Sequence, residues 1–287
     1  MRVFRVGLLG LGTVGSGVAR LIDSHRSLWR DRHGFEIDLR RVLVRDLHKC
    51  RDADVDRNRI TADPVSIVEA DDIDLVIEAM GGIDPAHAYL SAAMKRGRPV
   101  VTANKALLSE RWDSLWTTAH QYGVELGIEG AVAAGIPLLR PLAQNLSAVR
   151  VTRIEACLNG TCNFVLRRMD GGCDLPAALD EARRLGYAEP DAGDDVSGRD
   201  VLRKGKVLSL IVFGRPPVVE SVGGIEAVTP ERVAALAAAG LRLALVAVLE
   251  GPEECPRLTV GLQELPLDQP LVNLTGPENA VLVESAP

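Results

Sequence analysis

Apolar and polar positions along the first half of the chain predict strands that alternate with helices. Segments rich in apolar residues at 4–9, 37–46, 73–82 and 98–102 read as strands, and the one at 73–82 reads as a buried strand. The segment after the first run is amphipathic, and its predicted apolar stripe continues through Val18, Leu21 and Ile22. Apolar strands separated by helices are typical of a parallel, doubly wound sheet with helices on both faces, which is an α/β fold.

The pattern changes in the second half. Residues 149–160 alternate as a strand does, residues 175–186 and 200–214 read as helices, and residues 256–265 and 279–285 are short extended runs. This mixture predicts an inserted α+β domain. We place the first domain at residues 1–135 and the second at 136–264, and we expect residues 265–287 to return to the first.

Composition narrows the class of protein. The 287 residues are 47% hydrophobic and 25% charged, as in a globular protein with an ample core. A net charge of −6 argues against a nucleic-acid partner. No apolar run reaches the roughly 20 residues of a membrane span, and glycines interrupt the apolar N-terminus, which reads as a strand rather than a signal peptide. We expect a cytoplasmic protein without a membrane partner.

Cysteines and histidines restrict the chemistry. The five cysteines form no C-x-x-C pair and no zinc-ligand spacing, which fits reduced thiols. The last histidine is His120, so the second half has none. Chemistry there must use carboxylates and amines.

The motif Gly10-x-Gly12-x-x-Gly15 lies between the first predicted strand and the first predicted helix. In that setting Gly10 permits a tight turn, Gly12 lets the backbone approach a pyrophosphate, and Gly15 lets helix and strand pack closely. The helix N-terminus offers unpaired N–H groups to phosphates. We therefore predict a Rossmann-type dinucleotide site that includes Thr13 and Val14.

Residues after the later strands extend this site. Arg45 and Asp46 end the second strand, where an arginine accommodates a 2′-phosphate and an acid suits a 2′-hydroxyl. Arg45 comes first, which favours NADP and leaves NAD open. Gly81, Gly82 and Lys105 follow later strands, at the sheet edge where ligands of this fold bind.

Residues 189–206 change from acidic to basic. Asp200 and Lys204 are four apart on a predicted helix and share one face, either in a reactive site or as an exposed ion pair. Glu189, Asp194 and Asp195 form an acidic rim that suits an ammonium-bearing substrate, and Asp195 or Ser197 could cap the helix.

A calcium loop of the EF-hand type does not fit this stretch. Counting from Asp191 puts Gly193 at position 3, where an acid is needed, and Val196 at position 6, where glycine is needed.

Taken together, these motifs resemble the homoserine dehydrogenase family. The matching stretches, in family order, are GLGTVGSGV, VIEAMGGIDPAHAYLSAAMKRGRPVVTANKALL, EGAVAAGIPLL, LNGTCNFVLRRM and EARRLGYAEPDAGDDVSGRDVLRKGKVLSLIVFG. The resemblance implies reversible, NAD(P)H-dependent reduction of L-aspartate 4-semialdehyde to L-homoserine, on the route to threonine and methionine. It also assigns substrate binding and homodimer formation to the second domain.

The resemblance implies roles for single residues. Lys204 matches the family's proposed proton donor, Asp200 its neighbouring aspartate, and Lys105 a lysine that touches cofactor and substrate. The substrate-binding residues implied are Glu189, which holds the amino group, Asp195, Asn159, Gly160 and Thr161. A monovalent-cation site, for sodium for example, is implied at Glu129, Val132, Ala134 and Ile136, partly through backbone carbonyls.

The chain departs from the family pattern at its end and at Cys162, where the family often has threonine. The sequence resembles a short form without a regulatory domain of the ACT type, and it stops before the family's glycine- and alanine-rich segment and final helix. A binding-only remnant of the family is therefore one alternative. Another is an aldehyde-oxidising dehydrogenase with Cys162 as nucleophile, although that chemistry needs a base beside the thiol and no histidine follows His120.

Overall fold

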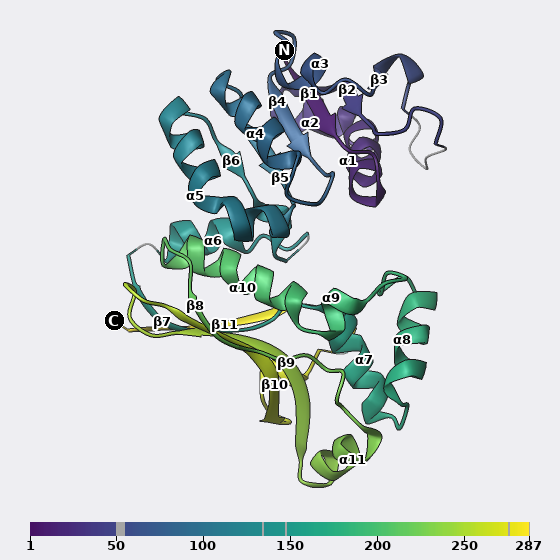
Figure 1. The fold of residues 1–287 in the computed structure, drawn as a ribbon, viewed down its shortest axis with the longest axis vertical. Coiled ribbons are helices and arrows are strands. Elements are labelled where there is room, and N and C mark those ends of the chain that lie inside the picture. The colour runs from purple at the N-terminus through teal and green to yellow at the C-terminus, as the bar shows by residue number, and fades with distance from the viewer. Residues whose placement is uncertain (50–54, 134, 147, 275, 287) are drawn as a thin grey trace. The chain divides into compact units, whose positions relative to one another are not determined.

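The chain folds into two compact units, each built around its own β-sheet. In this computed structural model they are Met1–Ala131 and Val132–Pro287 (Figure 1). The structure describes residues 1–49, 55–133, 135–146, 148–274 and 276–286. Within these ranges no helix combines the length and the apolar character needed to cross a membrane.

The first unit contains a six-stranded sheet in the order β3-β2-β1-β4-β5-β6. The strands are β1 (Arg2–Leu9), β2 (Phe35–Leu43), β3 (Ile60–Thr61), β4 (Leu75–Glu78), β5 (Val100–Thr102) and β6 (Leu126–Gly127). Every neighbouring pair is parallel. This is the strand order of a Rossmann fold, whose ligands bind beyond the carboxyl ends of the strands where the order reverses, at β1 and β4. The predicted α/β class is confirmed.

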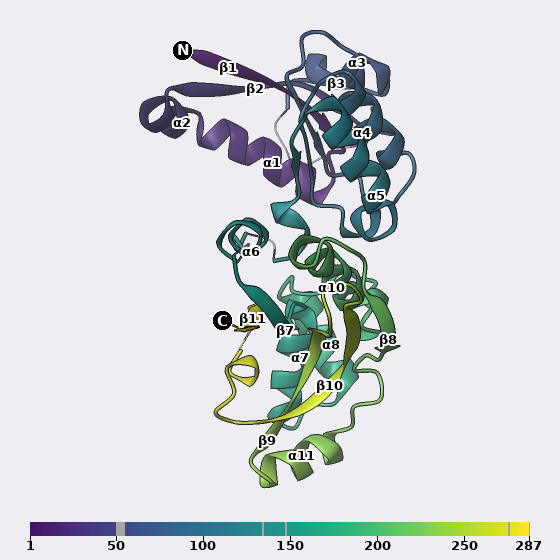
Figure 2. The ribbon, with the colours of Figure 1, turned by 90° about the vertical axis from the view of Figure 1, so that its left-hand side faces the viewer.

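Helices cover both faces of this sheet. They are α1 (Thr13–Ser24), α2 (Arg26–His33), α3 (Val65–Val68), α4 (Ala86–Lys95) and α5 (Lys105–Tyr122), with short 3-10 turns η1 (Arg57–Arg59) and η2 (Glu129–Ala131). Helices α4 and α5 pack side by side on one face, and α1 lies against the other (Figure 2). Ala19 and Ile22 of α1 are buried in one core cluster with β1 and β2, with Val18 packed against it. Leu21 is exposed, so its place in the predicted stripe was wrong.

The second unit contains a five-stranded mixed sheet in the order β11-β7-β9-β10-β8. The strands are β7 (Arg150–Cys157), β8 (Val218–Val222), β9 (Leu241–Glu250), β10 (Arg257–Pro266) and β11 (Ala280–Ala286). Only the β10–β8 pair is parallel among these described strands. The predicted α+β character of this part is therefore confirmed.

One helix of the second unit, α10, carries both Asp200 and Lys204. The helices are α6 (Leu139–Asn145), α7 (Gly160–Asp170), α8 (Leu175–Arg184), α9 (Gly193–Val196), α10 (Arg199–Val212) and α11 (Pro230–Ala238), with η3 (Pro270–Val272) as a 3-10 turn. Helix α10 contacts β7, β9 and β10. At Gly205 an added Cβ would lie 2.9 Å from Leu258 Cδ1 of β10, so a glycine there lets the helix lie directly on the sheet.

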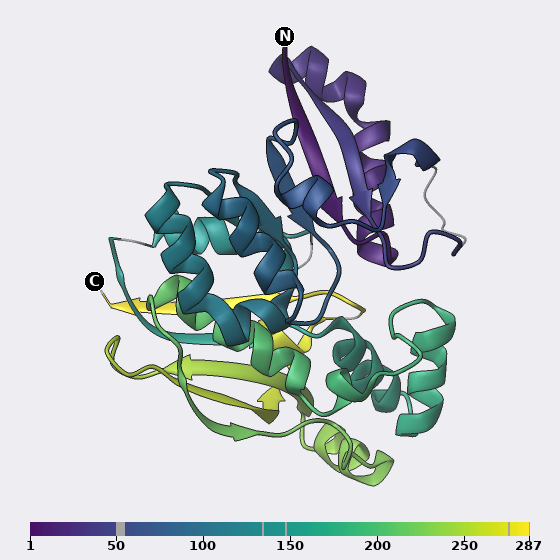
Figure 3. The same cartoon turned by 45° about the horizontal axis from the view of Figure 1, so that its top comes forward.

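The expected return of residues 265–287 to the first domain was wrong. Strand β11 instead pairs antiparallel with β7, from Ala280 opposite Cys157 to Ala286 opposite Arg150 (Figure 3). The reason is apolar packing, because Ala280 and Leu282 pack against a buried cluster of the second sheet that includes Cys157. The division after Ala131 also falls four residues before the expected boundary.

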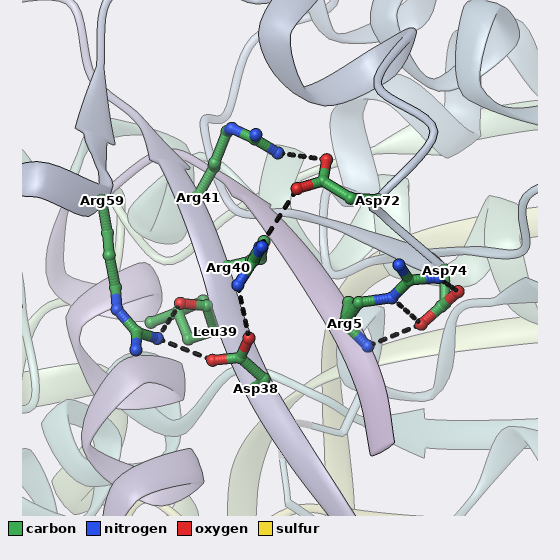
Figure 4. Close-up of polar contacts among 8 residues, drawn as sticks. All are labelled: Arg5, Asp38, Leu39, Arg40, Arg41, Arg59, Asp72 and Asp74. Carbon is green, nitrogen blue, oxygen red and sulfur yellow. Dashed lines mark hydrogen bonds and ion pairs between the residues drawn. The ribbon is translucent and has the colours of Figure 1, made fainter. Parts of the chain in front are cut away.

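Arginines and aspartates link β1, β2 and the amino end of β4 in the first unit (Figure 4). Arg5 donates two side-chain hydrogen bonds to Asp74, at 2.9 and 2.7 Å. Asp72 accepts from Arg41 at 2.5 Å and from Arg40 at 3.1 Å. The hydrogen bond from Arg41, with a smaller one from Arg40, outweighs the effect of burial and lowers the pKa of Asp72 to about 2. These contacts link β1 and β2 to the residues just before β4, at the amino end of that strand.

Candidate functional site

The first unit has a pocket at the carboxyl ends of its central strands. Its volume is about 820 Å³, which is ample for part of a dinucleotide. The lining residues are Gly10, Leu11, Gly12, Leu43, Val44, Arg45, Asp46, Lys49, Ala79, Met80, Gly81, Gly82, Asp84 and Pro85. The predicted cofactor residues Gly10, Gly12, Arg45 and Gly81 are thus brought together.

Three glycines of the motif shape the turn from β1 into α1, and two of them, Gly10 and Gly12, line the pocket. Gly10 has φ +100°, and an added Cβ would lie 2.7 Å from the Ala79 carbonyl oxygen, so the turn requires glycine. A Cβ on Gly15 would lie 2.1 Å from the Gly10 carbonyl oxygen, so helix α1 can approach β1 only with glycine there. Around Gly12 no atom lies within 4 Å of an added Cβ, which leaves room for a phosphate. Thr13 and Val14 begin α1, whose N-cap has no side-chain hydrogen bond.

The rim of the pocket beyond β2 carries mixed charge. Arg45 and Asp46 both line it and are exposed. Lys49, which the sequence reasoning did not single out, lines the same rim. Its only signal in the sequence is a second basic residue four positions after Arg45.

Lys105 is the first residue of α5 and is partly buried. Asn104 caps this helix, because its Oδ1 accepts the Leu107 N–H at 3.1 Å. The buried carboxylate of Glu78, another residue that the sequence reasoning missed, accepts hydrogen bonds from Thr102 and from the backbone of Met80 and Gly81. An acid at the end of an otherwise apolar strand was the available signal.

In the second unit, Lys204 and Asp200 form a largely buried ion pair on α10. Lys204 Nζ lies 2.8 Å from Asp200 Oδ2, and the side chains are 16% and 6% exposed. Lys204 Nζ also donates to the Leu158 carbonyl oxygen at 2.6 Å. The interpretation of these residues as an exposed surface pair was therefore wrong, because both sit against the end of β7 and the start of α7.

Asn159 joins this pair to a second carboxylate. Its Nδ2 donates to Asp195 Oδ1 at 2.7 Å and to Asp200 Oδ2 at 2.8 Å. Its Oδ1 accepts the Cys162 N–H at 2.8 Å and so caps α7. One buried amide thus holds two carboxylates and a helix N-terminus in a single arrangement.

The neighbouring predicted residues have structural contacts of their own. Thr161 Oγ1 donates to the Tyr187 carbonyl oxygen at 2.7 Å. An added Cβ on Gly160 would lie 2.8 Å from Pro277 Cα, so the start of α7 packs tightly against that segment. Glu189 is exposed in the connection between α8 and α9.

Asp194 is engaged by arginines rather than turned toward Lys204. It accepts from Arg199 at 2.8 Å and from Arg203, and the hydrogen bond from Arg203 is the main cause that lowers its pKa. The cap predicted for α10 was wrong. The N-cap is Gly198 in the left-handed conformation, and Ser197 Oγ donates instead to the Gly193 carbonyl oxygen at 2.7 Å.

Cys162 is unsuited to act as a nucleophile. It is fully buried, and burial, followed by the nearby Asp195 and Asp200, raises the pKa of its thiol well above the usual range. Its Sγ donates to the Asp195 carbonyl oxygen at 3.3 Å. A neutral, inaccessible thiol argues against the aldehyde-oxidising alternative.

The residues of the expected cation site fall on both sides of the division. Glu129 lies in the first unit, Val132 and Ile136 in the second, and Ala134 lies outside the described residues. In the described part of the chain no three His, Cys, Asp or Glu side chains are grouped as metal ligands.

Comparison with known proteins identifies the family. The family model described as "Homoserine dehydrogenase" matches residues 137–287, and "Homoserine dehydrogenase, NAD binding domain" matches residues 10–129. The chain belongs to the homoserine dehydrogenase family. Its first unit is the nicotinamide-dinucleotide-binding domain of that family.

Named relatives agree with this assignment. The homoserine dehydrogenase of Bacillus subtilis is 35% identical over 99% of this chain and 66% of its own length, and that of Synechocystis is 36% identical with the same coverage. The chain thus spans about two thirds of the length of these relatives. A crystal structure of a homoserine dehydrogenase from Thiobacillus denitrificans is similar with a TM-score of 0.90 and 34% identity, over 99% of this chain and 67% of that one. A hyperthermophilic archaeal homoserine dehydrogenase in complex with NADPH is similar with a TM-score of 0.81 and 25% identity, over 99% and 88% of the two chains.

Proposed function

We propose that the protein reversibly reduces L-aspartate 4-semialdehyde to L-homoserine with NADPH, in threonine and methionine biosynthesis. The observation that carries the proposal is the buried Lys204–Asp200 pair, on a chain whose other unit is a nicotinamide-dinucleotide-binding domain. Lys204 places a largely buried ammonium 2.8 Å from the Asp200 carboxylate, where little water screens its charge. Such a group is suited to a reaction in which negative charge develops on oxygen.

Lys204 acts on the carbonyl oxygen of the substrate. When bound, the nicotinamide cofactor would supply a hydride to the aldehyde carbon. The electron pair of the carbonyl bond then moves to oxygen, and one N–H of Lys204 stabilises that charge and gives its proton to form the hydroxyl. An ammonium has three N–H groups, and Leu158 O and Asp200 Oδ2 accept two of them, so we assign the third to the substrate oxygen.

Acidic residues receive the ammonium group of the substrate. Glu189 is exposed in the loop before α9, and Asp195 is held by Asn159 near Lys204. We assign Glu189 and Asp195 to the substrate ammonium, and Asn159, Gly160 and Thr161 to the wall that positions the substrate.

The pocket of the first unit holds the cofactor. We assign Gly10, Gly12, Thr13 and Val14 to the pyrophosphate, and the open space at Gly12 supports this assignment. Gly15 contributes by letting α1 pack closely on the Gly10 turn. Gly81 and Lys105 lie at the carboxyl ends of the next strands. Arg45 and Lys49 on the pocket rim favour the 2′-phosphate of NADP, and Asp46 leaves NAD as the second choice.

Further assignments follow from the family. The family resemblance implies a monovalent cation such as sodium near Glu129, whose carboxylate is a hard oxygen donor of the kind such ions prefer. We infer a homodimer joined through the second unit. We also infer a cytoplasmic location, supported by Cys157, Cys162, Cys173 and Cys255, all of which are unpaired.

One spectrophotometric assay tests the proposed function. The purified protein should oxidise NADPH only when aspartate 4-semialdehyde is present, and should do so with lower efficiency for NADH. Binding of NADPH without turnover would instead indicate a binding-only remnant of the family. Phosphate-dependent reduction of NADP with the same aldehyde would indicate thiol chemistry at Cys162.

A further inference from the structure

Glu78 at the end of β4 is a buried acid that the proposed mechanism leaves without a role. Glu78 is only 1% exposed. Its Oε1 accepts the N–H groups of Met80 at 2.7 Å and Gly81 at 3.1 Å, with the Asn104 amide at 3.5 Å. Its Oε2 accepts the hydroxyl of Thr102 at 2.5 Å. Every one of these partners donates, so the carboxylate is satisfied by neutral groups.

These contacts join two separate loops. Met80 and Gly81 belong to the turn after β4. Thr102 is the last residue of β5 and Asn104 follows it, more than twenty positions along the chain. Asn104 strengthens the link, because its Nδ2 donates to the Gly82 carbonyl oxygen at 2.6 Å and its backbone N–H donates to Thr102 Oγ1 at 3.0 Å.

The same network determines where Lys105 begins its helix. Asn104 caps α5 through Oδ1, and Lys105 is the first residue of that helix. Gly81 and Gly82 line the dinucleotide pocket and have φ +73° and +74°. Two turns that flank the carboxyl ends of β4 and β5 are therefore held by one side chain.

Burial explains why this carboxylate can act as a rigid link. A polar group removed from water is costly unless it is hydrogen-bonded, so each lost partner would leave a buried oxygen or N–H unsatisfied. Rearranging one loop therefore disturbs the contacts of the other. Asp74, just before the same strand, differs because it is partly exposed and paired with Arg5.

We propose that Glu78 is a positioning residue that couples the Gly81–Gly82 turn to the start of α5 and so sets the geometry of the cofactor pocket and of Lys105. It acts through Asn104 and the backbone rather than on the reacting atoms. The inference rests on the proposed function only for its kinetic consequence, because loop order and cofactor binding are measurable without turnover.

The test compares four variants of the full chain. Glu78→Ala removes all four acceptor contacts. Thr102→Val removes, at constant shape, the hydroxyl that donates to Glu78 and accepts the Asn104 N–H, and Glu78→Gln keeps an acceptor for the backbone N–H groups. Asp74→Asn is the matched control, because it perturbs a carboxylate at the other end of β4. The readouts are the dissociation constant of NADPH, by fluorescence, and amide hydrogen exchange of residues 79–82 and 103–107.

We expect Glu78→Ala to raise the dissociation constant of NADPH more than about 10-fold. Thr102→Val should raise it about 3- to 10-fold, and Glu78→Gln less than about 3-fold. Exchange should rise in both segments together in the first two variants and stay near wild type in Asp74→Asn. If Glu78→Ala does not fold, Thr102→Val decides the question.

The proposal is overturned if exchange rises in only one segment, or if cofactor binding weakens no more than in Asp74→Asn. Absence of semialdehyde turnover in the wild-type protein would reject the proposed function. Exchange and NADPH affinity would still decide the role of Glu78.

Discussion

Two sets of ion pairs in this molecule differ in how far they are exposed to water, and therefore in what they contribute. The network of Arg5, Arg41, Asp72 and Asp74 lies in the first unit, with side chains 31–39% exposed. The Lys204–Asp200 pair lies in the second unit, with side chains 16% and 6% exposed. Water screens the first set and leaves each pair a small contribution to stability. The second pair is largely removed from water, so the loss of either partner would be strongly destabilising. Its charges are also little screened and can therefore act on a bound substrate.

The largest expected effect is on turnover. Replacing Lys204 by alanine removes the proposed proton donor, and we expect kcat to fall by about 10²- to 10⁴-fold. The dissociation constant of NADPH should change little, because the pocket for the dinucleotide lies in the first unit. Steady-state kinetics and a binding titration separate these effects.

Lys206→Ala on the same helix is the control and should keep wild-type turnover. Unchanged turnover in Lys204→Ala would show that the Lys204–Asp200 pair, like the exposed network, has no part in catalysis.

A smaller effect is expected on stability at Asn159. Asn159→Ala removes the cap of α7, worth about 1 kcal/mol, and also the amide that donates to Asp195 and Asp200. We expect the free energy of unfolding to fall by about 2–3 kcal/mol in urea titration.

Asp174→Ala isolates the cap alone. Asp174 caps α8 through the Ala177 N–H at 2.9 Å and is exposed. It should cost about 1 kcal/mol. If Asn159→Ala and Asp174→Ala lower the free energy of unfolding equally, the hydrogen bonds from the Asn159 amide to Asp195 and Asp200 contribute nothing to stability.

The smallest effect belongs to the exposed network. Asp72→Asn should lower the free energy of unfolding at pH 7 by about 0.2–1 kcal/mol, and less in high salt. The pKa of Asp72 in the folded protein is about 2, below the ordinary value near 3.9. Its stabilisation is therefore complete above about pH 4 and is lost as the pH falls through 2.

Urea titrations of the wild type and Asp72→Asn between pH 7 and pH 2.5 measure this difference. The gap between the two proteins should narrow only below about pH 4, from the same pKa shift. A gap that is constant across this range would show that shape, not charge, sets the contribution of Asp72.

The sequence predicted what depends on backbone conformation and local spacing. Gly10 and Gly15 could be assigned because a tight turn and a close approach exclude every other residue, and the structure shows both. Asp200 and Lys204 could be placed on one face of a helix because they are four positions apart. The burial of that pair did not follow, because it depends on the Leu158 carbonyl oxygen, a backbone acceptor that no residue type reveals.

Long-range pairing was the part that the pattern could not supply. Residues 279–285 read correctly as a strand, but an alternating pattern does not specify which sheet edge will receive it. Glu78 was overlooked for a similar reason. Its partners at Thr102 and Asn104 are brought to it by the parallel pairing of β4 with β5.

The pairing of β7 with β11 has a consequence for synthesis on the ribosome. The first unit is complete once Ala131 has emerged, so it can fold while the rest is still being translated. Strand β7 at residues 150–157 must wait for residues 280–286 before its outer edge is covered. During that interval the growing chain exposes an unpaired strand edge, and this is the stage at which we expect it to depend most on chaperones.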